Sequence, residues 1–167
     1  MKDADEEQFR EFMVGRWPTL VRLAYGLTGD RGLAEDLAQT TLANVYASWS
    51  KVSRASNPDA YTFRILLNAN NGRFRKRRVA EQPAGAVPEP EAQDPTGAVD
   101  QRTVLITALM ELAPRQRATV LLRYFEDLSE AQTAEALGCS VGTVKSQTSS
   151  ALARLRQSPH LAEGSAR

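Results

Sequence analysis

Residues 128–156 read LSEAQTAEALGCSVGTVKSQTSSALARLR, a pattern that predicts two short helices joined by a tight turn. Ser129 followed three residues later by Gln132 forms the capping box that begins a helix. Gly138 can adopt the left-handed conformation that a sharp turn needs, and Ser140 is a suitable N-cap for the second helix. The stretch is therefore predicted to be a helix-turn-helix.

The predicted helix-turn-helix spans residues 129–156. Its second helix, which begins at Val141, carries polar side chains on the face that its apolar residues leave exposed. They are Thr143, Lys145, Ser146, Gln147, Ser149 and Ser150. Such groups hydrogen-bond base edges and phosphates in the major groove of DNA. A solvated amphipathic helix without a ligand is the alternative, but such helices usually carry Glu–Lys pairs. The pattern favours binding to duplex DNA.

Apolar residues with a helical repeat occur in the rest of the chain as well. Toward the N-terminus they predict helices around Leu20–Leu27 and Leu33–Trp49, and Asn57-Pro58 is a good start for another. Toward the C-terminus two further stripes are expected, one of Leu105, Leu109 and Leu112 and one of Val120, Leu121, Tyr124 and Phe125. No segment alternates with the period of a strand, so the predicted fold class is all-α.

Residues 80–100 differ in composition from both flanks. They contain four prolines and two glycines, and almost no large apolar side chain. Proline and glycine at this density forbid a regular helix. The segment is predicted to be a flexible, acidic linker, which divides the chain into two small helical domains, residues 1–79 and 101–160.

The formal net charge of +1 conceals a partition along the chain. Residues 51–78 carry 8 basic and 1 acidic side chains, whereas residues 79–100 carry 5 acidic and no basic ones. A concentrated positive block suggests a polyanionic partner, although a solvated basic helix end would have the same composition.

Part of this basic block has features that suit single-stranded DNA. Residues 50–57 are polar and are predicted to form a loop flexible enough to hold an unstacked base. Ahead of the basic run 73–78, the next helix carries Tyr61, Phe63, Arg64 and Asn68. Bases stack on aromatic rings while phosphates meet cations, so interleaved aromatic and arginine residues fit a single strand. The alternative is that at least one of the two aromatic rings lies in the core.

Enzymatic chemistry has little support in the sequence. Cys139 and His160 are the only soft metal ligands and lie far apart, and no Ser/His/Asp grouping or glycine-rich phosphate loop occurs. No catalytic residue, metal, cofactor or small-molecule substrate is therefore expected. Cys139 is expected to be a small packing residue, with a redox switch as the alternative.

The cellular location is predicted from the cysteine count, the apolar runs and the N-terminal residues. A single cysteine fits a reducing compartment, and no run approaches the roughly 18 apolar residues of a membrane span. The acidic N-terminus lacks the apolar core of a secretory signal. We expect a cytoplasmic protein with no membrane association.

Three stretches resemble the extracytoplasmic-function (ECF, group IV) sigma factors of the sigma-70 family, especially the actinobacterial SigE-like type. They are AEDLAQTTLANVYASW (34–49), NPDAYTFRILLNAN (57–70) and LAPRQRATVLLRYFEDLSEAQTAEALGCSVGTVKSQ (112–147). These small factors keep only the region 2 and region 4 domains, and the resemblance extends from about residue 8 to residue 157. It implies a protein that binds core RNA polymerase and directs promoter recognition, DNA melting and transcription initiation.

The resemblance also implies roles for individual residues. The contact with the β′ clamp helices of core polymerase would be made by Asp36, Gln39, Thr40 and Asn44. The −10 strand would be bound by Lys51, Arg54, Asn57, Tyr61, Arg64, Asn68, Arg73 and Arg75. The −35 duplex would be read by the polar face of the helix-turn-helix, with Arg115, Arg117 and Arg123 near its phosphates. Further partners implied are the β flap of polymerase and an anti-sigma factor.

Three positions depart from the family's pattern. Gly72 stands where aspartate is common, and a glycine inside a helix costs about 1 kcal/mol relative to alanine, which leaves the placement of residues 73–78 open. Gln147 and Ser150 stand where arginine is common, which suggests a shifted −35 preference. Two other classes of protein stay open: a conventional helix-turn-helix regulator that works without polymerase, and a sigma-like interaction module that binds polymerase but does not initiate.

Overall fold

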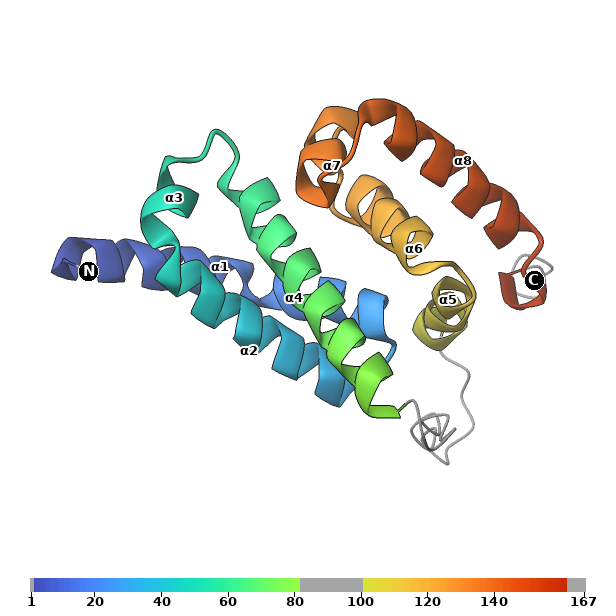
Figure 1. Ribbon diagram of the computed structural model, residues 1–167, viewed down its shortest axis with the longest axis horizontal. Helices are drawn as coiled ribbons and strands as arrows, with labels where there is room; N and C mark the ends of the chain where they lie inside the picture. The colour runs from blue at the N-terminus through green and yellow to red at the C-terminus, as the bar shows by residue number, and fades with distance from the viewer. Residues whose placement is uncertain (1, 82–100, 162–167) are drawn as a thin grey trace.

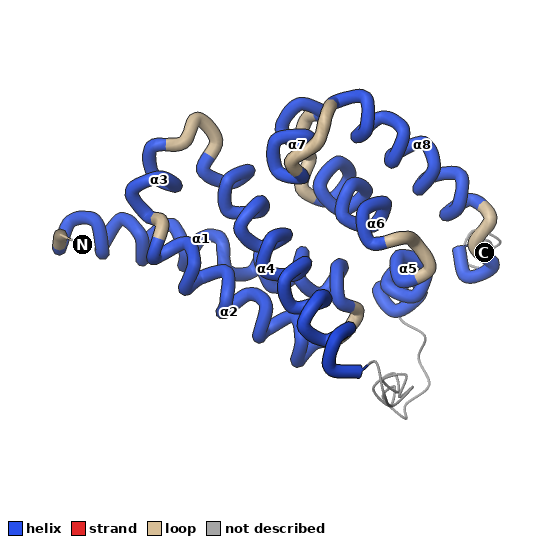
Figure 2. The backbone as a smooth tube through the Cα atoms, viewed as in Figure 1, coloured by secondary structure: helices blue, strands red, loops and turns tan. Residues whose placement is uncertain are grey.

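The structure, a computed structural model, describes residues 2–81 and 101–161. All regular elements in these two ranges are helices (Figure 2). The first range holds α1 (Asp3–Thr28), α2 (Arg31–Ala47), α3 (Trp49–Arg54) and α4 (Pro58–Glu81). The second holds α5 (Gln101–Met110), α6 (Pro114–Val120), the π-helical turn η1 (Leu121–Phe125), α7 (Glu130–Leu137) and α8 (Val141–Arg156). The all-α prediction is confirmed.

In the N-terminal domain, α2 packs against both α1 and α4 (Figure 1). The turn between α1 and α2 depends on Gly29, whose φ of 70° lies in the left-handed region that glycine adopts without a steric penalty. Asp30 then caps α2, because its carboxylate accepts a hydrogen bond from the Leu33 N–H at 2.9 Å. Leu20, Leu37 and Leu66, one from each long helix, are fully buried where these helices meet.

Helix α4 begins as the sequence predicts and ends later than expected. The Asn57 side-chain oxygen accepts a hydrogen bond from the Ala60 N–H at 3.0 Å, and Pro58 occupies the first turn. The helix then continues through Gly72 to Glu81. Gly72 therefore does not end the helix, and Arg73 and Arg75 lie on the same continuous α4 as Arg64.

The predicted loop over residues 50–57 is wrong for its first part. Residues up to Arg54 belong to the short helix α3, and only residues 55–57 connect it to α4. The reason is that Trp49 and Val52, three positions apart, are both buried, at 6% and 0% exposure. Burial of this pair pulls one helical turn against the core, so the polar residues around it are held on a helix.

In the C-terminal domain, α8 packs against α6 and α7. Pro114 begins α6, and the Gln116 side chain accepts a hydrogen bond from the Ala113 N–H at 3.2 Å. The predicted apolar stripe that starts at Val120 is only half correct. Val120 and Leu121 are buried, whereas Tyr124 and Phe125 are 50% and 43% exposed. The π-helical geometry of η1 changes the number of residues per turn, so these two rings leave the buried face.

The two domains are packed against each other. Helix α1 contacts α5, α6 and η1, and α4 contacts α7 (Figure 1). A single hydrophobic cluster includes Leu23 and Leu27 of the first domain together with Leu109 and Leu121 of the second. The described part of the chain therefore forms one closed, two-domain body.

The predicted linker, residues 80–100, lies outside the described residues from residue 82 on, and Ala80 and Glu81 are the last residues of α4. Among the helices that the structure describes, none is long and apolar enough to cross a lipid bilayer.

Candidate nucleic-acid interface

The helix-turn-helix has the capping geometry that the sequence predicts. The Ser129 hydroxyl accepts a hydrogen bond from the Gln132 N–H at 3.0 Å, and the Gln132 side chain accepts one from the Ser129 N–H at 2.9 Å. Gly138 has a φ of 66° and ends α7, and the Ser140 hydroxyl accepts from the Thr143 N–H at 3.1 Å to begin α8. Val144, which is fully buried, anchors α8 in the domain. The cap and the buried valine set which face of α8 points outward.

The outward face of α8 is polar, as expected. Lys145, Ser146, Ser149 and Ser150 are exposed, and Thr143 and Gln147 are half-buried. The Thr143 hydroxyl lies 2.9 Å from that of Ser140, and the Ser146 hydroxyl donates to the Thr143 carbonyl at 3.1 Å. These local bonds leave Lys145, Gln147, Ser149 and Ser150 as the side chains of this face that are not used by hydrogen bonds within α8.

A shallow hollow of about 340 Å³ lies beside this face. Its lining includes three cations, Arg123, Lys145 and Arg156, one acidic residue, Glu130, and the hydroxyl of Ser149. The cations outnumber the single carboxylate, so the net positive charge of the lining suits a phosphate group. Sequence reasoning missed Arg156, although a signal was present: Lys145, Ser149, Leu152 and Arg156 are spaced by four, three and four residues, which places them on one stripe of α8.

The three arginines expected near −35 phosphates have different environments. Arg115 is exposed on α6. Arg123 lines the hollow, and one of its guanidinium N–H groups donates to the Leu128 carbonyl. Arg117 does not point toward α8's outward face, because its guanidinium donates to four backbone carbonyls at the junction of the two domains. In this closed arrangement Arg117 is not available to a phosphate.

The expected single-strand surface is formed by α3, the segment 55–57 and α4. Lys51 and Arg54 are exposed on α3, while Asn57 is half-buried because it caps α4. Arg64 and Asn68, four residues apart, are exposed on one face of α4. The structure thus places these cations and polar groups on α3 and on the first half of α4, two helices that contact each other.

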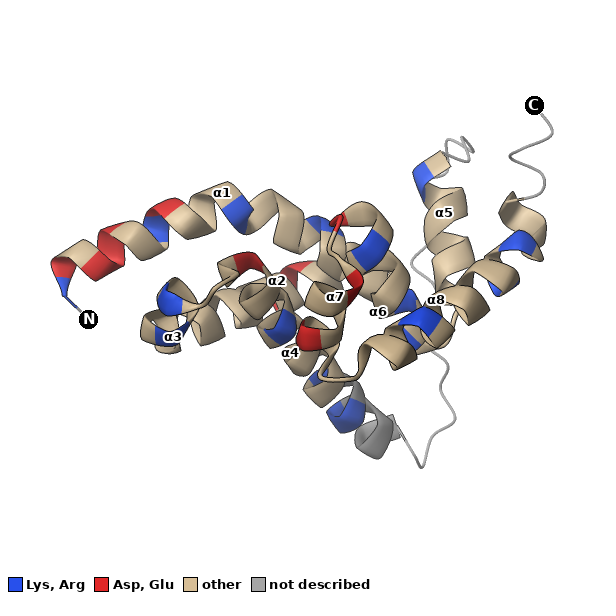
Figure 3. Ribbon diagram, turned by 90° about the horizontal axis from the view of Figure 1, so that it is seen from above, with Lys and Arg blue, Asp and Glu red and all other residues tan. Residues whose placement is uncertain are grey.

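The aromatic and distal basic residues of this surface are placed as follows. Phe63 is a core residue at 4% exposure, whereas Tyr61 is half-buried and packs at the edge of the core. Arg75 is exposed on α4, and Arg73 donates to the Leu33 carbonyl of α2 at 3.0 Å. Figure 3 shows basic residues near the end of α4 and along α8.

A third polar surface lies on α2. Asp36, Gln39, Thr40 and Asn44 are all exposed, because Leu37, Ala38 and Val45 take the buried side of the helix. The four residues therefore form a polar face that a partner protein can reach without any rearrangement of the domain.

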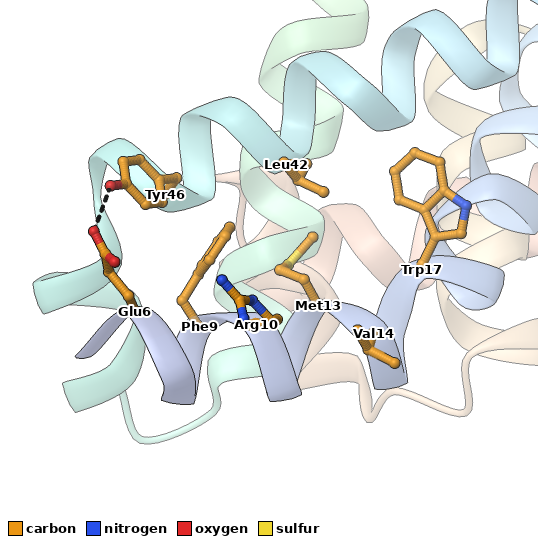
Figure 4. A pocket seen from close by; sticks show the side chains of 8 residues that line it. All are labelled: Glu6, Phe9, Arg10, Met13, Val14, Trp17, Leu42 and Tyr46. Carbon is orange, nitrogen blue, oxygen red and sulfur yellow. Dashed lines mark hydrogen bonds between the residues drawn. The ribbon is translucent and has the colours of Figure 1, made fainter. Parts of the chain in front are cut away.

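A groove of about 410 Å³ adjoins this polar face, between α1 and α2 (Figure 4). Apolar side chains of both helices line it, among them Phe9, Leu42 and Val14, the last of which is 71% exposed. The Tyr46 hydroxyl donates to the Glu6 carboxylate at 3.4 Å across one end of the groove. The sequence pattern marked Leu42 only as a core residue, so its place in the groove was missed.

In the described ranges, no group of three His, Cys, Asp or Glu side chains is placed to hold a metal ion. His160 lies 3.2 Å from the Glu111 carboxylate, and Cys139 is partly exposed in the turn between α7 and α8. Neither residue has a partner set that points to catalysis.

A helix-turn-helix with a polar outward face, together with a second helical domain that carries a basic helix, is typical of DNA-binding proteins. Each of the two domains is matched by a protein-family model. The model described as Sigma-70 region 2 matches residues 14–79, and the model for Sigma-70 region 4 matches residues 102–155.

Relatives identify the class more closely. The chain is similar to the RNA polymerase sigma-E factor of Streptomyces coelicolor, with 40% identity over 90% of this chain and 85% of the relative. It is similar to the ECF RNA polymerase sigma factor SigL of Mycobacterium tuberculosis, with 32% identity over 82% of this chain and 80% of the relative. The chain belongs to the sigma-70 family of RNA polymerase sigma factors, in its ECF, SigE-like branch. It therefore directs promoter recognition in transcription initiation.

A solved structure matches both domains together. The sigma factor RpoE from Bartonella quintana, in its co-crystal structure with the anti-sigma factor NepR, superposes with a TM-score of 0.80 and 30% identity over 90% of this chain and 96% of that one. A score this high over nearly the whole chain requires α1–α4 and α5–α8 to superpose at once. The two domains of that factor therefore have a mutual arrangement like the one described here.

Proposed function

We propose that the chain selects promoters through three surfaces and performs no chemistry itself. The polar face of α2 docks on core polymerase, α3 and α4 bind the −10 single strand, and α8 reads the −35 duplex. The observation that carries the proposal is that all three surfaces are exposed together on one chain. Polymerase would supply the active site, and the protein would work in the cytosol, where polymerase and promoter DNA are found.

The docking surface for core polymerase is Asp36, Gln39, Thr40 and Asn44. A helical partner such as the β′ clamp helices fits it, because the adjoining α1–α2 groove accepts apolar side chains beside the polar face. The C-terminal domain would contact the β flap. An anti-sigma factor is a further proposed partner, since the similar factor from Bartonella quintana is described in complex with one.

The −10 strand would lie along α3 and α4. Arg64 and Asn68 would meet bases and backbone, and the half-buried Tyr61 would offer the exposed part of its ring face for stacking. The cations that would follow the phosphates are Lys51, Arg54, Arg73 and Arg75. Asn57 would keep its capping role at the start of α4.

The −35 duplex would receive α8 in its major groove. Gln147 and Ser149 would face base edges, while Arg115, Arg123, Lys145 and Arg156 would hold phosphates. Arg117, which the sequence placed in this group, is left out of the proposal because its donors are already used within the protein.

Lys145→Ala is expected to weaken binding to −35 duplex DNA of every sequence alike. One phosphate contact fewer lowers the slope of log affinity against log salt by about 1. Fluorescence anisotropy over a salt series measures this slope. The control is Arg154→Ala, since Arg154 is an exposed cation on α8 outside the hollow. An equal loss of slope in both variants would contradict a specific phosphate contact at Lys145.

Gln147→Ala is expected to change which promoters are chosen rather than how much transcript is made in total. A bidentate amide contact to a base contributes about 1–3 kcal/mol of discrimination, so the preferred −35 base at one position should relax about tenfold or more. Gln157→Ala, at the other end of α8, removes the same side chain away from the reading face. Unchanged promoter preferences in a sequenced transcript pool would show that Gln147 does not read a base.

The proposed function is tested by transcription in vitro with core RNA polymerase, the full chain and a library of promoter fragments from the host genome. Initiation at a shared two-part motif is the expected result. Stable duplex binding without polymerase and no initiation would favour a conventional regulator. Core binding without initiation would favour a sigma-like interaction module.

A further inference from the structure

Val141, the first residue of α8, is an apolar side chain exposed at the start of the second helix of the helix-turn-helix. It is 39% exposed, and within α8, which the structure describes in full, no other large apolar residue is exposed. A single exposed apolar residue on a protein surface has no meaning by itself. Its surroundings and its position on α8 decide whether it has a role.

The fold does not account for Val141. This residue belongs neither to the hydrophobic core nor to the half-buried side chains packed against the core. The Ser140 hydroxyl caps α8, and the apolar pair that often braces a helix start would join Cys139 and Val144 instead. A Cβ added at the neighbouring Gly142 would meet no atom of another segment nearer than the Ser140 hydroxyl, at 3.8 Å. The start of α8 is therefore open to a partner.

The polar side chains around Val141 are small and already hydrogen-bonded. The Ser140 and Thr143 hydroxyls lie 2.9 Å apart, and the Ser140 hydroxyl also accepts from the Thr143 N–H at 3.1 Å. The Ser146 hydroxyl donates to the Thr143 carbonyl at 3.1 Å. Because Gly142 has no side chain and Val144 is buried, the two methyl groups of Val141 are the apolar surface that the first turn of α8 presents to a partner.

The position of Val141 on α8 is the one that meets base edges when such a helix enters DNA. In a helix-turn-helix, the N-terminal residues of the second helix contact the bases in the major groove. The Cα–Cβ bonds of a helix tilt toward its N-terminus, so the Val141 side chain lies at the leading end of α8. Lys145, proposed above to hold a phosphate, follows one turn later on the same side of the helix.

The ligand that such a surface recognises follows from the chemistry of the major groove. The base edges there carry hydrogen-bond donors and acceptors, and their apolar group is the C5-methyl of thymine. The Val141 side chain has no donor or acceptor, whereas its methyl groups can exclude water from a thymine methyl and gain van der Waals contact with it. Thymine is therefore the base that this side chain favours.

We propose that Val141 is a specificity-determining residue, which selects a thymine in the −35 element through contact with the C5-methyl group of that base. The role of Val141 rests on the proposed reading of the −35 duplex by α8. It adds apolar recognition of one base to the hydrogen bonds and phosphate contacts proposed for the other residues of the helix.

The spacing along α8 limits where this thymine lies. Val141 and Gln147, the amide proposed to read a base, are six residues apart, which is about 9 Å along a helix that rises about 1.5 Å per residue. Base pairs are stacked about 3.4 Å apart. The thymine that Val141 contacts and the base whose selection relaxes in Gln147→Ala should therefore lie within about three base pairs of each other.

The contact is tested by removing the thymine methyl without changing the base pair. Deoxyuridine pairs with adenine as thymidine does and lacks only the C5-methyl group. Holoenzyme, assembled from core polymerase and the full chain, is titrated with promoter duplexes whose −35 element was selected from a random library, and each −35 thymine on either strand is replaced in turn. Replacement at one position should weaken binding about fourfold, the effect of one buried methyl group, and the other positions should have little effect.

Two variants show whether Val141 is the residue that senses the methyl group. Val141→Ser removes the apolar contact and should abolish the difference between thymidine and deoxyuridine duplexes, whereas the matched control Val141→Ile should retain it. Because the readout is a ratio between two duplexes, a general loss of affinity in Val141→Ser cancels. A parent holoenzyme that binds every deoxyuridine duplex as tightly as the thymidine duplex would overturn the proposal. A selected −35 element without an A·T pair, or the parent's ratio in Val141→Ser, would overturn it as well.

Failure of the proposed function has a different signature in the same titration. A holoenzyme that does not prefer the selected −35 element to a scrambled one would count against the reading of the duplex by α8, and the role of Val141 would fall with it. A preference that persists while the methyl group has no effect at any position would overturn the role of Val141 alone.

Discussion

Asp36→Ala combined with Gln39→Ala should abolish transcription at every promoter while leaving the fold intact. Both side chains are exposed on α2. Within the described part of the chain neither has a hydrogen-bond partner, so their truncation leaves no other group unpaired. Truncating one partner of a hydrogen-bonded charge pair that is buried at an interface, as proposed for Asp36, costs about 2–5 kcal/mol, and each 1.4 kcal/mol is about tenfold in affinity. A loss of at least about thirtyfold in affinity for core polymerase is expected, measured by competition binding and by transcript yield.

The matched control for that pair is Glu7→Ala with Gln8→Ala. Both residues are exposed and lie on α1 outside the groove lining. Their substitution removes one carboxylate and one amide, as in the test pair. The control should bind polymerase as the parent does. Equal transcription by the Asp36 and Gln39 variant and the parent would show that polymerase docks elsewhere on the chain.

Local signals in the sequence predicted the helices well where capping residues mark their ends. Ser129, Gln132, Gly138 and Ser140 fixed both helices of the helix-turn-helix to the residue, because each makes the backbone contact that its side chain or conformation favours. Asn57 did the same for α4. These features depend on neighbours within a few residues, so a single chain contains the information to recognise them.

Features that depend on distant neighbours were missed. The chain alone gave no reason to place Val52 in a core, so residues 50–54 were predicted as loop rather than α3. The extra residue in the turn of η1 moved Tyr124 and Phe125 off the expected apolar stripe. Helical spacing assumes 3.6 residues per turn, and it fails wherever tertiary packing selects another turn.

The contact between domains was invisible for a related reason. Arg117 was predicted to meet DNA phosphates because it is an arginine in the region 4 pattern, and no local signal shows that the ends of α1 and α5 converge on it. Gly26 attracted no prediction, since a glycine in an apolar helix has no distinguishing pattern until its neighbour Leu121 is known. Residue type indicated that Arg117 could bind an acceptor, but only the arrangement of the helices shows which groups it binds.

Arg64→Ala combined with Asn68→Ala should prevent promoter opening while the −35 contact persists. The two side chains are exposed one turn apart on α4, where they would bind the melted −10 strand. A hydrogen bond contributes about 0.5–1.5 kcal/mol, and one that involves a charged group about 1.5–3 kcal/mol. Capture of an extruded base offsets an unstacking cost of a few kcal/mol, so losing both contacts should reduce open complexes by about 10- to 100-fold. Permanganate reactivity of −10 thymines, with holoenzyme at saturating concentration, measures the open fraction.

A premelted promoter, with mismatched bases over the −10 element, separates melting from every earlier step. If Arg64 and Asn68 act by capturing the strand as it opens, the premelted template should recover a large part of the lost transcription, because the unstacking cost no longer has to be met by these contacts. Lys2→Ala with Gln8→Ala, an exposed cation before α1 and an exposed amide on α1, both outside the groove lining, is the control for surface charge and should open promoters normally. A defect in the Arg64 and Asn68 variant that is equally severe on duplex and premelted templates would place these residues in polymerase docking or chain folding rather than in promoter opening.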